Sequence, residues 1–113
     1  MSGPVLTPDL ALDYLGELST DIRAAVVLDS HGKLAAVTGG DEPRGEQMCE
    51  LATEMLDAAA EAGEAIDQVE AVTTEGSVFA VRGRSWTVAV VAGRQPLASL
   101  MFYDLRNVVR DLG

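Results

Sequence analysis

Four glutamates spaced four residues apart form the most regular set of ionisable side chains in the chain. Glu42, Glu46, Glu50 and Glu54 recur at the interval that places helical side chains on one face, and Asp57 extends that face. Paired carboxylates can serve as a general acid and base, or can bind a cation. Catalysis of that kind needs an environment that separates two pKa values, which one solvated helix face does not supply. Calcium needs converging oxygens, usually from a loop.

The acidic face is therefore predicted to be solvated or to bind a basic partner protein. Like charges at this spacing cost about 0.2–0.5 kcal/mol per pair in isolated helices, and no lysine offsets them. A partner carrying Arg or Lys would gain mainly in association rate. The candidate partner-binding residues are Glu46, Glu50, Glu54 and Asp57.

The single cysteine, Cys49, and the single histidine, His31, are the next candidates for chemistry. A thiol and an imidazole can form a nucleophile and its base, but these two are expected on a helix and in a hairpin turn, with no orienting group. Cys49 is predicted to pack inside and His31 to be an exposed turn residue. One His and one Cys fall short of the roughly four ligands of structural zinc. No metal and no cofactor are expected.

The sequence contains neither a P-loop nor a Gly-x-Gly-x-x-Gly motif, so nucleotide binding by those mechanisms is not expected. Arg82, Arg84 and Arg94 fall near predicted turns. They are interpreted as solvated, with an arginine finger toward a partner's phosphates as the alternative. Trp86 is predicted to lie in the core, with a partner-contacting rim position as its alternative.

Charge and composition exclude several classes of protein. The net charge is −10, and residues 42–75 carry ten acidic side chains against one basic side chain, Arg44. Such a surface repels nucleic acid and anionic membranes. One cysteine permits no intramolecular disulfide, the N-terminus lacks signal-peptide features, and no apolar run reaches about 20 residues. We therefore expect a cytoplasmic, soluble protein.

Apolar periodicity and turn residues predict the order helix, two strands, helix, three strands, helix. Thr7, Pro8 and Asp9 are typical of a helix start. Residues 1–6 are expected to be a flexible tail and residues 7–113 a single domain. The predicted strands are 22–29, 34–37, 67–74, 77–82 and 86–92, and the later helices are 41–62 and 97–112.

Each predicted helix carries an apolar stripe that must be buried against the sheet. For the first helix the stripe is Leu10, Tyr14, Leu15, Leu18 and Ile22. For the second it is Met48, Leu51, Ala52, Met55, Leu56, Ala59 and Ala62, and for the third Leu97, Leu100, Met101, Leu105, Val108, Val109 and Leu112. Strands joined by short turns pair antiparallel, so the class is α+β.

This order of elements resembles the roadblock dynein-light-chain family over residues 9–112. Residues 24–35, with the Asp29-x-x-Gly32 turn, are similar to the first hairpin of the family; residues 75–81 are similar to a later hairpin and 97–106 to the closing helix. The resemblance implies an αββαβββα, roadblock/profilin-like fold with a five-stranded antiparallel sheet ordered 2-1-5-4-3. One helix then covers one face and two cover the other. The acidic, Ala- and Arg-rich composition favours a bacterial member.

A homodimer is expected on two grounds. The resemblance implies that third strands pair across the dyad and second helices lie side by side. Independently, a sheet edge needs covering, and residues 69–74 have no Pro or Lys to protect it. The alternative is a monomer that buries these positions in its own core. The candidate interface residues are Met48, Ala52, Met55, Ala59, Val69, Ala71, Val72 and Thr73.

Two functions follow as hypotheses. The resemblance implies a non-catalytic, homodimeric regulator or scaffold of a small Ras-like GTPase. The alternative is a small-molecule-sensing module of profilin-like or PAS-like architecture, which predicts an apolar cavity with converging polar groups. An enzyme is the least favoured class because no nucleophile, acid–base pair or metal constellation is present in the sequence.

Overall fold

One antiparallel sheet of five strands, ordered β2-β1-β5-β4-β3, organises the chain. The computed structural model describes residues 6–19, 21–61, 68–74, 76–93 and 98–113. The strands are β1 Ile22–Leu28, β2 Leu34–Val37, β3 Gln68–Thr73, β4 Gly76–Arg82 and β5 Thr87–Ala92; the helices are α1 Pro8–Leu18, α2 Glu42–Glu61, α3 Ala98–Leu112 and the short 3-10 helix η1 Thr38–Gly40. The predicted α+β class, element order and strand order are confirmed.

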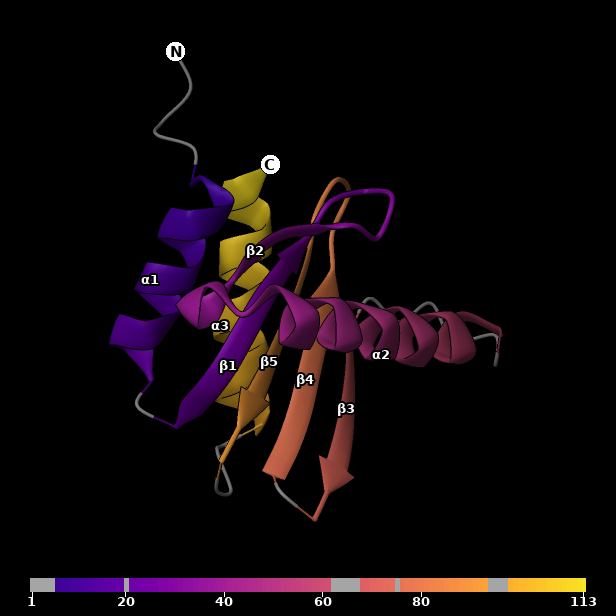
Figure 1. The fold of residues 1–113 in the computed structure, drawn as a ribbon. Helices are drawn as coiled ribbons and strands as arrows, with labels where there is room; N and C mark the ends of the chain where they lie inside the picture. The colour runs from indigo at the N-terminus through magenta and orange to yellow at the C-terminus, as the bar shows by residue number, and fades with distance from the viewer. Residues whose placement is uncertain (1–5, 20, 62–67, 75, 94–97) are drawn as a thin grey trace.

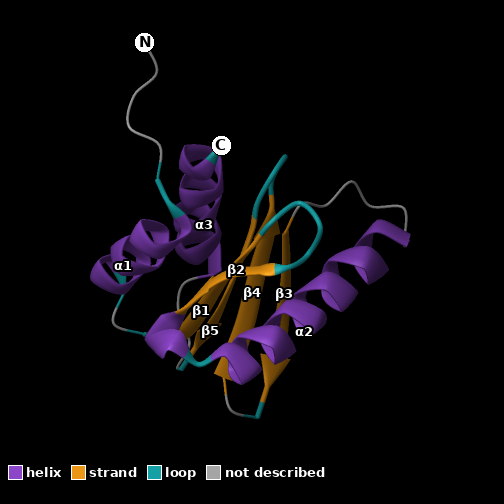
Figure 2. Cartoon of the chain, turned by 45° about the horizontal axis from the view of Figure 1, so that its top comes forward, coloured by secondary structure: helices purple, strands orange, loops and turns teal. Residues whose placement is uncertain are grey.

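The helices divide between the two faces of the sheet, as the resemblance implied. Figures 1 and 2 show α2 lying across one face, with α1 and α3 on the other. Two hydrophobic clusters result, one on each face. Alternate β1 residues supply both clusters: Ala25 and Val27 pack toward α1 and α3, whereas Val26 and Leu28 pack toward α2. Because β1 is covered on both faces, its residues read as a nearly continuous apolar run.

Helix α1 begins where predicted but packs through a different stripe. The Leu10 amide donates to Thr7 Oγ1 at 3.2 Å, and Pro8 occupies the first turn. Its buried residues are Ala11, Leu12 and Leu15. Of the predicted stripe only Leu15 is buried. Leu10, Tyr14 and Leu18 are exposed large hydrophobic residues, and Ile22 belongs to β1.

This correction has a physical cause: the apolar arc of α1 is wider than the strip that the sheet and α3 cover. Leu6, which was predicted to belong to the flexible tail 1–6, packs against the α1–α3 cluster, and its amide donates to the Asp111 carbonyl at 3.1 Å. The expected flexibility of residues 1–5 concerns residues outside the described part of the chain.

Helix α2 buries Gly45, Met48, Cys49, Ala52 and Leu56. Burial of Cys49 is as predicted, but Leu51 is 41% exposed, which corrects its place in the buried stripe. Gly45 lets the helix approach β2, because a Cβ there would lie 2.9 Å from Leu34 Cδ2 and 3.0 Å from the Val37 side chain. Ala62, the predicted last residue of this helix, falls outside the described residues.

The last three strands form the predicted meander. β4 pairs with β3 and β5, placing Ala80 opposite both Val69 and Ala89. The last of these strands, β5, begins at Thr87 and not at Trp86 as predicted, because the Gly83 amide donates to the Trp86 carbonyl at 2.8 Å and closes the turn one residue later. Residue 75, the first of the segment 75–81 that resembles a later hairpin of the family, lies outside the described residues.

Helix α3 covers the β4 and β5 side of its face. Its buried residues include five of the predicted stripe: Met101, Leu105, Val108, Val109 and Leu112. Leu100 is instead 56% exposed, and Leu97 lies outside the described residues. Phe102 and Phe79 meet edge to face, with ring centroids 5.3 Å apart. Within the described ranges, no helix is both long and apolar enough to cross a bilayer.

Candidate partner-binding surfaces

The acidic face of α2 is fully presented to solvent. Glu46, Glu50, Glu54 and Asp57 are all exposed, as predicted. Asp57 differs from the others, because its Oδ1 accepts from Arg82 Nη2 at 2.9 Å. Among the described residues, the three glutamates form no ion pair. The uncompensated part of the face is therefore Glu46, Glu50 and Glu54.

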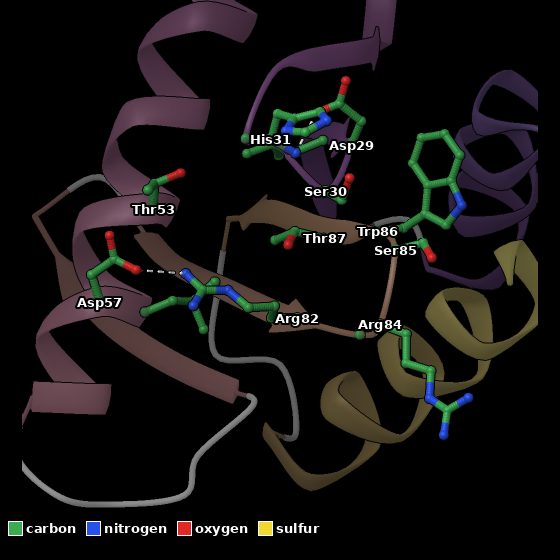
Figure 3. A pocket seen from close by; sticks show the side chains of 14 residues that line it. Asp29, Ser30, His31, Thr53, Asp57, Arg82, Arg84, Ser85, Trp86 and Thr87 are labelled. Atoms are coloured by element: carbon green, nitrogen blue, oxygen red, sulfur yellow. Dashed lines mark hydrogen bonds and ion pairs between the residues drawn. The ribbon is translucent and has the colours of Figure 1, made fainter.

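Arg82 and Asp57 form one wall of a hollow of about 300 Å³ at the end of the sheet. This hollow lies between α2, the β1–β2 turn and the β4–β5 turn (Figure 3), and we call it the first hollow. Thr53, Ser30 and Ser85 contribute hydroxyl groups to its lining. Its lining is largely polar and includes an ion pair, and it lies at the sheet end and not between the layers, so it differs from the apolar cavity that the ligand-sensing alternative predicts.

The two arginines of this hollow behave differently. Arg82 is held by Asp57, while the Arg84 side chain points away from the hollow in Figure 3. Trp86 is partly buried and packs against the α1–α3 cluster, and it also lines the first hollow. Arg94, the third arginine considered, lies outside the described residues.

The β1–β2 turn is fixed by Asp29. Its Oδ1 accepts from the His31 amide at 2.8 Å and from the Lys33 amide at 3.0 Å. These bonds, first that from Lys33 and then that from His31, hold the pKa of the Asp29 carboxyl below its usual value. Gly32 takes a φ of 76°, a conformation that favours glycine. His31 is exposed in this turn, as predicted.

A second hollow, also about 300 Å³, lies between this turn and α2. His31 and Cys49 both line it, together with Glu46, Glu50 and other α2 residues. Because His31 and Cys49 lie far apart in the sequence, their proximity was not predicted from it. Burial and then the neighbouring Glu46 raise the pKa of the Cys49 thiol to about 11. Because the thiolate is the nucleophilic form, the arrangement does not favour covalent chemistry at neutral pH.

The side chains of the described part of the chain do not converge on a metal site. It contains no group of three or more His, Cys, Asp and Glu side chains placed to hold a metal ion. The carboxylates of α2 point outward along a single helix and do not converge. Their arrangement is suited to long-range attraction of positive charge rather than to coordination.

Among the described strands, β3 lies at an edge of the sheet and pairs with β4 alone. Val72 on this strand is 79% exposed, the largest exposed fraction among the large hydrophobic residues described. Val69 pairs with Ala80, and Ala71 pairs with Val78. Val69 and Ala71 are partly buried, and Val69 packs against the α2 cluster. The side chain of Thr73 is outside the description. An unprotected edge with an exposed valine is a ready site for strand pairing.

The α2 candidates for self-association separate into two groups. Met48 is 8% and Ala52 0% exposed, because both pack into the protomer's own core, which is the alternative interpretation of these positions. Met55 and Ala59 are partly buried, and Leu51 is exposed. Residues 51, 55 and 59 follow one another at four-residue intervals, so they form a single apolar row on the flank of α2. Leu51, which the sequence prediction placed inside, belongs to this surface.

Comparison with solved structures shows which fold this is. The chain is similar to a Roadblock/LC7 domain from Streptomyces avermitilis (TM-score 0.83, 23% identity, 95% of each chain covered). It is also similar to the gliding protein MglB from Thermus thermophilus (TM-score 0.66, 15% identity, 99% of this chain and 97% of that one) and to Myxococcus xanthus MglB (TM-score 0.62, 14% identity, 85% of each). No family model matches the sequence, and no curated protein matches it. The chain has the Roadblock/LC7 fold.

Proposed function

We propose that this chain is a non-catalytic Roadblock/LC7 domain that forms a homodimer and regulates or scaffolds a small Ras-like GTPase. The observation that carries the proposal is the full-length fold likeness to a Roadblock/LC7 domain and to MglB. The sequence resemblance to the roadblock family supports the same function, because members of that family commonly act on such GTPases. We further propose that residues 7–113 are one domain and that the protein acts in the cytoplasm.

Two features of the protomer support self-association. The open edge of β3 presents Val72 to solvent, and α2 presents the row Leu51, Met55 and Ala59. Pairing β3 with its copy would satisfy the free backbone groups of the edge. A symmetric dimer would bury the same patch on both copies, so the assembly would close at two copies.

The acidic face of α2 supports a basic contact surface on the partner. Glu46, Glu50 and Glu54 point away from the core and lack compensating cations among the described residues. In a dimer with α2 helices side by side, two such faces would lie together and their mutual repulsion would increase. A partner surface rich in Arg or Lys relieves that repulsion and is attracted over about a Debye length.

Binding should be measured by calorimetry with the Ras-like GTPase encoded nearest to this chain in its own genome. The GTPase is loaded in turn with GDP and with a non-hydrolysable GTP analogue. A regulator distinguishes the two states, so we expect affinities that differ by about 5- to 150-fold. Glu50→Gln combined with Glu54→Gln should weaken binding about fivefold or more, mainly through slower association.

The matched control makes the same charge change on the opposite layer. Asp13→Asn combined with Glu17→Gln on α1 should leave GTPase affinity within about twofold, because long-range attraction is screened beyond roughly 8 Å. Absence of binding in both nucleotide states would contradict the GTPase function. Equal losses in the two double variants would contradict the placement of the contact on α2.

Ligand sensing remains a second candidate because of the first hollow. Its volume of about 300 Å³ is at the lower limit for small-molecule sites, and its lining mixes Arg82, Asp57 and hydroxyl groups. A sensing role predicts that Thr53→Trp, which would fill the hollow, abolishes the response to the ligand while dimerisation persists. The hollow opens on the surface and its lining carries charged side chains where this function predicts an apolar cavity, so we rank this function second.

A further inference from the structure

Helix α1 carries an apolar row that lies outside the hydrophobic core of the described residues. Leu10, Tyr14 and Leu18 are 54%, 42% and 42% exposed, and they follow one another at four-residue intervals. The contacts of α1 with the core come instead from Ala11, Leu12 and Leu15. Scattered exposed leucines are ordinary on protein surfaces, but three large side chains aligned over two helical turns form a continuous strip.

An acidic row runs beside this strip. Asp9, Asp13 and Glu17 are exposed, again four residues apart. Asp13 follows Leu10 by three residues and Glu17 follows Tyr14 by three, which makes each pair neighbours on the helix surface. Among the described residues, none of these three carboxylates forms an ion pair. The outer face of α1 is thus an apolar strip with an uncompensated negative border.

We propose that this outer face of α1 docks a basic amphipathic helix of a partner protein. The apolar strip calls for leucine-like side chains at four-residue intervals, and the carboxylate row calls for lysine or arginine along one side of them. From Leu10 to Leu18 the strip is about 12 Å long, which matches two turns of a partner helix. Rows of this spacing on two helices interdigitate at a crossing angle of about −50°.

The charge pattern selects this occupant over two others. A second copy of the chain would bring one acidic row against another, with a net charge of −10 on each copy. An anionic membrane would repel the same row, although it would accept the leucines. Only a surface that combines apolar and basic side chains satisfies both halves of the pattern.

This surface is separate from those of the proposed function. Figure 2 shows α1 and α2 on opposite sides of the sheet, so a protein on α1 leaves the α2 face free. A dimer would then present α2 to one partner and α1 to another, which is what a scaffold requires. The docking inference does not depend on the GTPase, and each can fail without the other.

The test uses a fluorescein-labelled peptide of about 18 residues, helical, with leucine at every fourth position and lysine beside it. Fluorescence anisotropy with the full chain should show saturable binding that weakens as salt increases. Tyr14→Ser combined with Leu18→Ser should weaken it about tenfold or more, because the peptide loses two of the three apolar contacts of the strip. Asp13→Lys combined with Glu17→Lys should also weaken binding and reduce its salt dependence.

A control variant on α3 keeps the test specific. Leu100→Ser with Tyr103→Ser removes two apolar side chains of α3 that are 56% and 57% exposed, and should change affinity less than about twofold. All variants alter exposed residues, so their urea unfolding midpoints should match the parent chain and separate lost binding from lost folding.

Several outcomes overturn the inference. One is the absence of saturable peptide binding. Another is an equal loss of affinity in the α1 and control variants, which would indicate only diffuse attraction of the basic peptide to an acidic protein. Light scattering that shows self-association abolished by Tyr14→Ser would assign the strip to a second copy. Binding to phosphatidylcholine–phosphatidylserine vesicles that Tyr14→Ser removes would assign it to a membrane.

Discussion

Gly83 lies where the β4–β5 turn meets α3. A Cβ at this position would clash with Val109 Cγ1 and would lie 3.4 Å from the Trp86 carbonyl oxygen. Val109 is 7% exposed, β-branched and held in the α1–α3 cluster, so it has little room to move. Gly83 therefore lets the β4–β5 turn approach α3 closely, in addition to its place in the turn.

Gly83→Ala should lower the free energy of unfolding by about 1–3 kcal/mol, because an extra methyl group overpacks the contact with Val109. Gly16→Ala is the matched control: nothing lies within 4 Å of its Cβ, and Gly16 is inside α1. That change should raise the free energy by about 0.5–1 kcal/mol through helix propensity. Urea denaturation measures both, and equal stability of the two variants would refute the packing role of Gly83.

At the scale of single residues, local chemistry was predictable and long-range pairing was not. The exposure of His31 and the burial of Cys49 followed from their places in a turn and a helix. The Arg82–Asp57 ion pair joins residues 25 positions apart. Nothing in the sequence indicates that the end of β4 reaches α2 at Asp57, so this contact requires the fold.

Among the elements, helix starts were more predictable than helix faces. Thr7 with Pro8, and Asp41 before α2, are local signals, and the Asp41 Oδ1 accepts from the Arg44 amide at 3.2 Å. The face of α1 was predicted wrongly because Leu10, Tyr14 and Leu18 satisfy helical periodicity as well as the residues that are buried. Which of two adjoining apolar rows packs inward depends on contacts with the sheet and α3, and therefore on the tertiary structure.

Thr7→Ala should destabilise the protein by about 1 kcal/mol, because the Leu10 amide loses its acceptor at the first turn of α1. Thr7→Ser retains an Oγ acceptor and should change stability by no more than a small fraction of that amount. Thermal unfolding of the three chains under one set of conditions makes the comparison. An alanine variant as stable as the serine variant would show that water caps this helix equally well.

For the whole molecule, strand order came from family resemblance, because strand patterns alone leave the sheet order of a mixed chain open. The residues predicted for the dimer interface show what a pattern leaves open: Met48 and Ala52 share a helix with Leu51, but the first two pack into the protomer's core whereas Leu51 is exposed. Burial by the sheet and burial by a second copy produce the same apolar periodicity. Only the position of α2 over the sheet separates them.

The edge of β3 provides the decisive test of assembly. Val72 is 79% exposed in the protomer, so Val72→Lys should leave folding intact and act only on pairing. Charged edge residues oppose strand pairing, and two copies would place lysines near each other across the dyad. Each loss of about 1.4 kcal/mol is a factor of ten, so we expect the dimer dissociation constant to rise about tenfold or more.

Sedimentation equilibrium of the parent chain, Val72→Lys and the β-branched control Val72→Thr measures this effect. The control retains strand propensity without charge and should remain close to the parent in dissociation constant. Leu51→Lys extends the test to α2, because a contact through both elements must be weakened by either lysine. If Leu51→Lys alone dissociates the dimer, the helices hold it together and the edge is free. A parent chain that stays monomeric at about 100 μM, far above a standard interface's dissociation constant, would leave β3 an uncovered edge and refute the dimer.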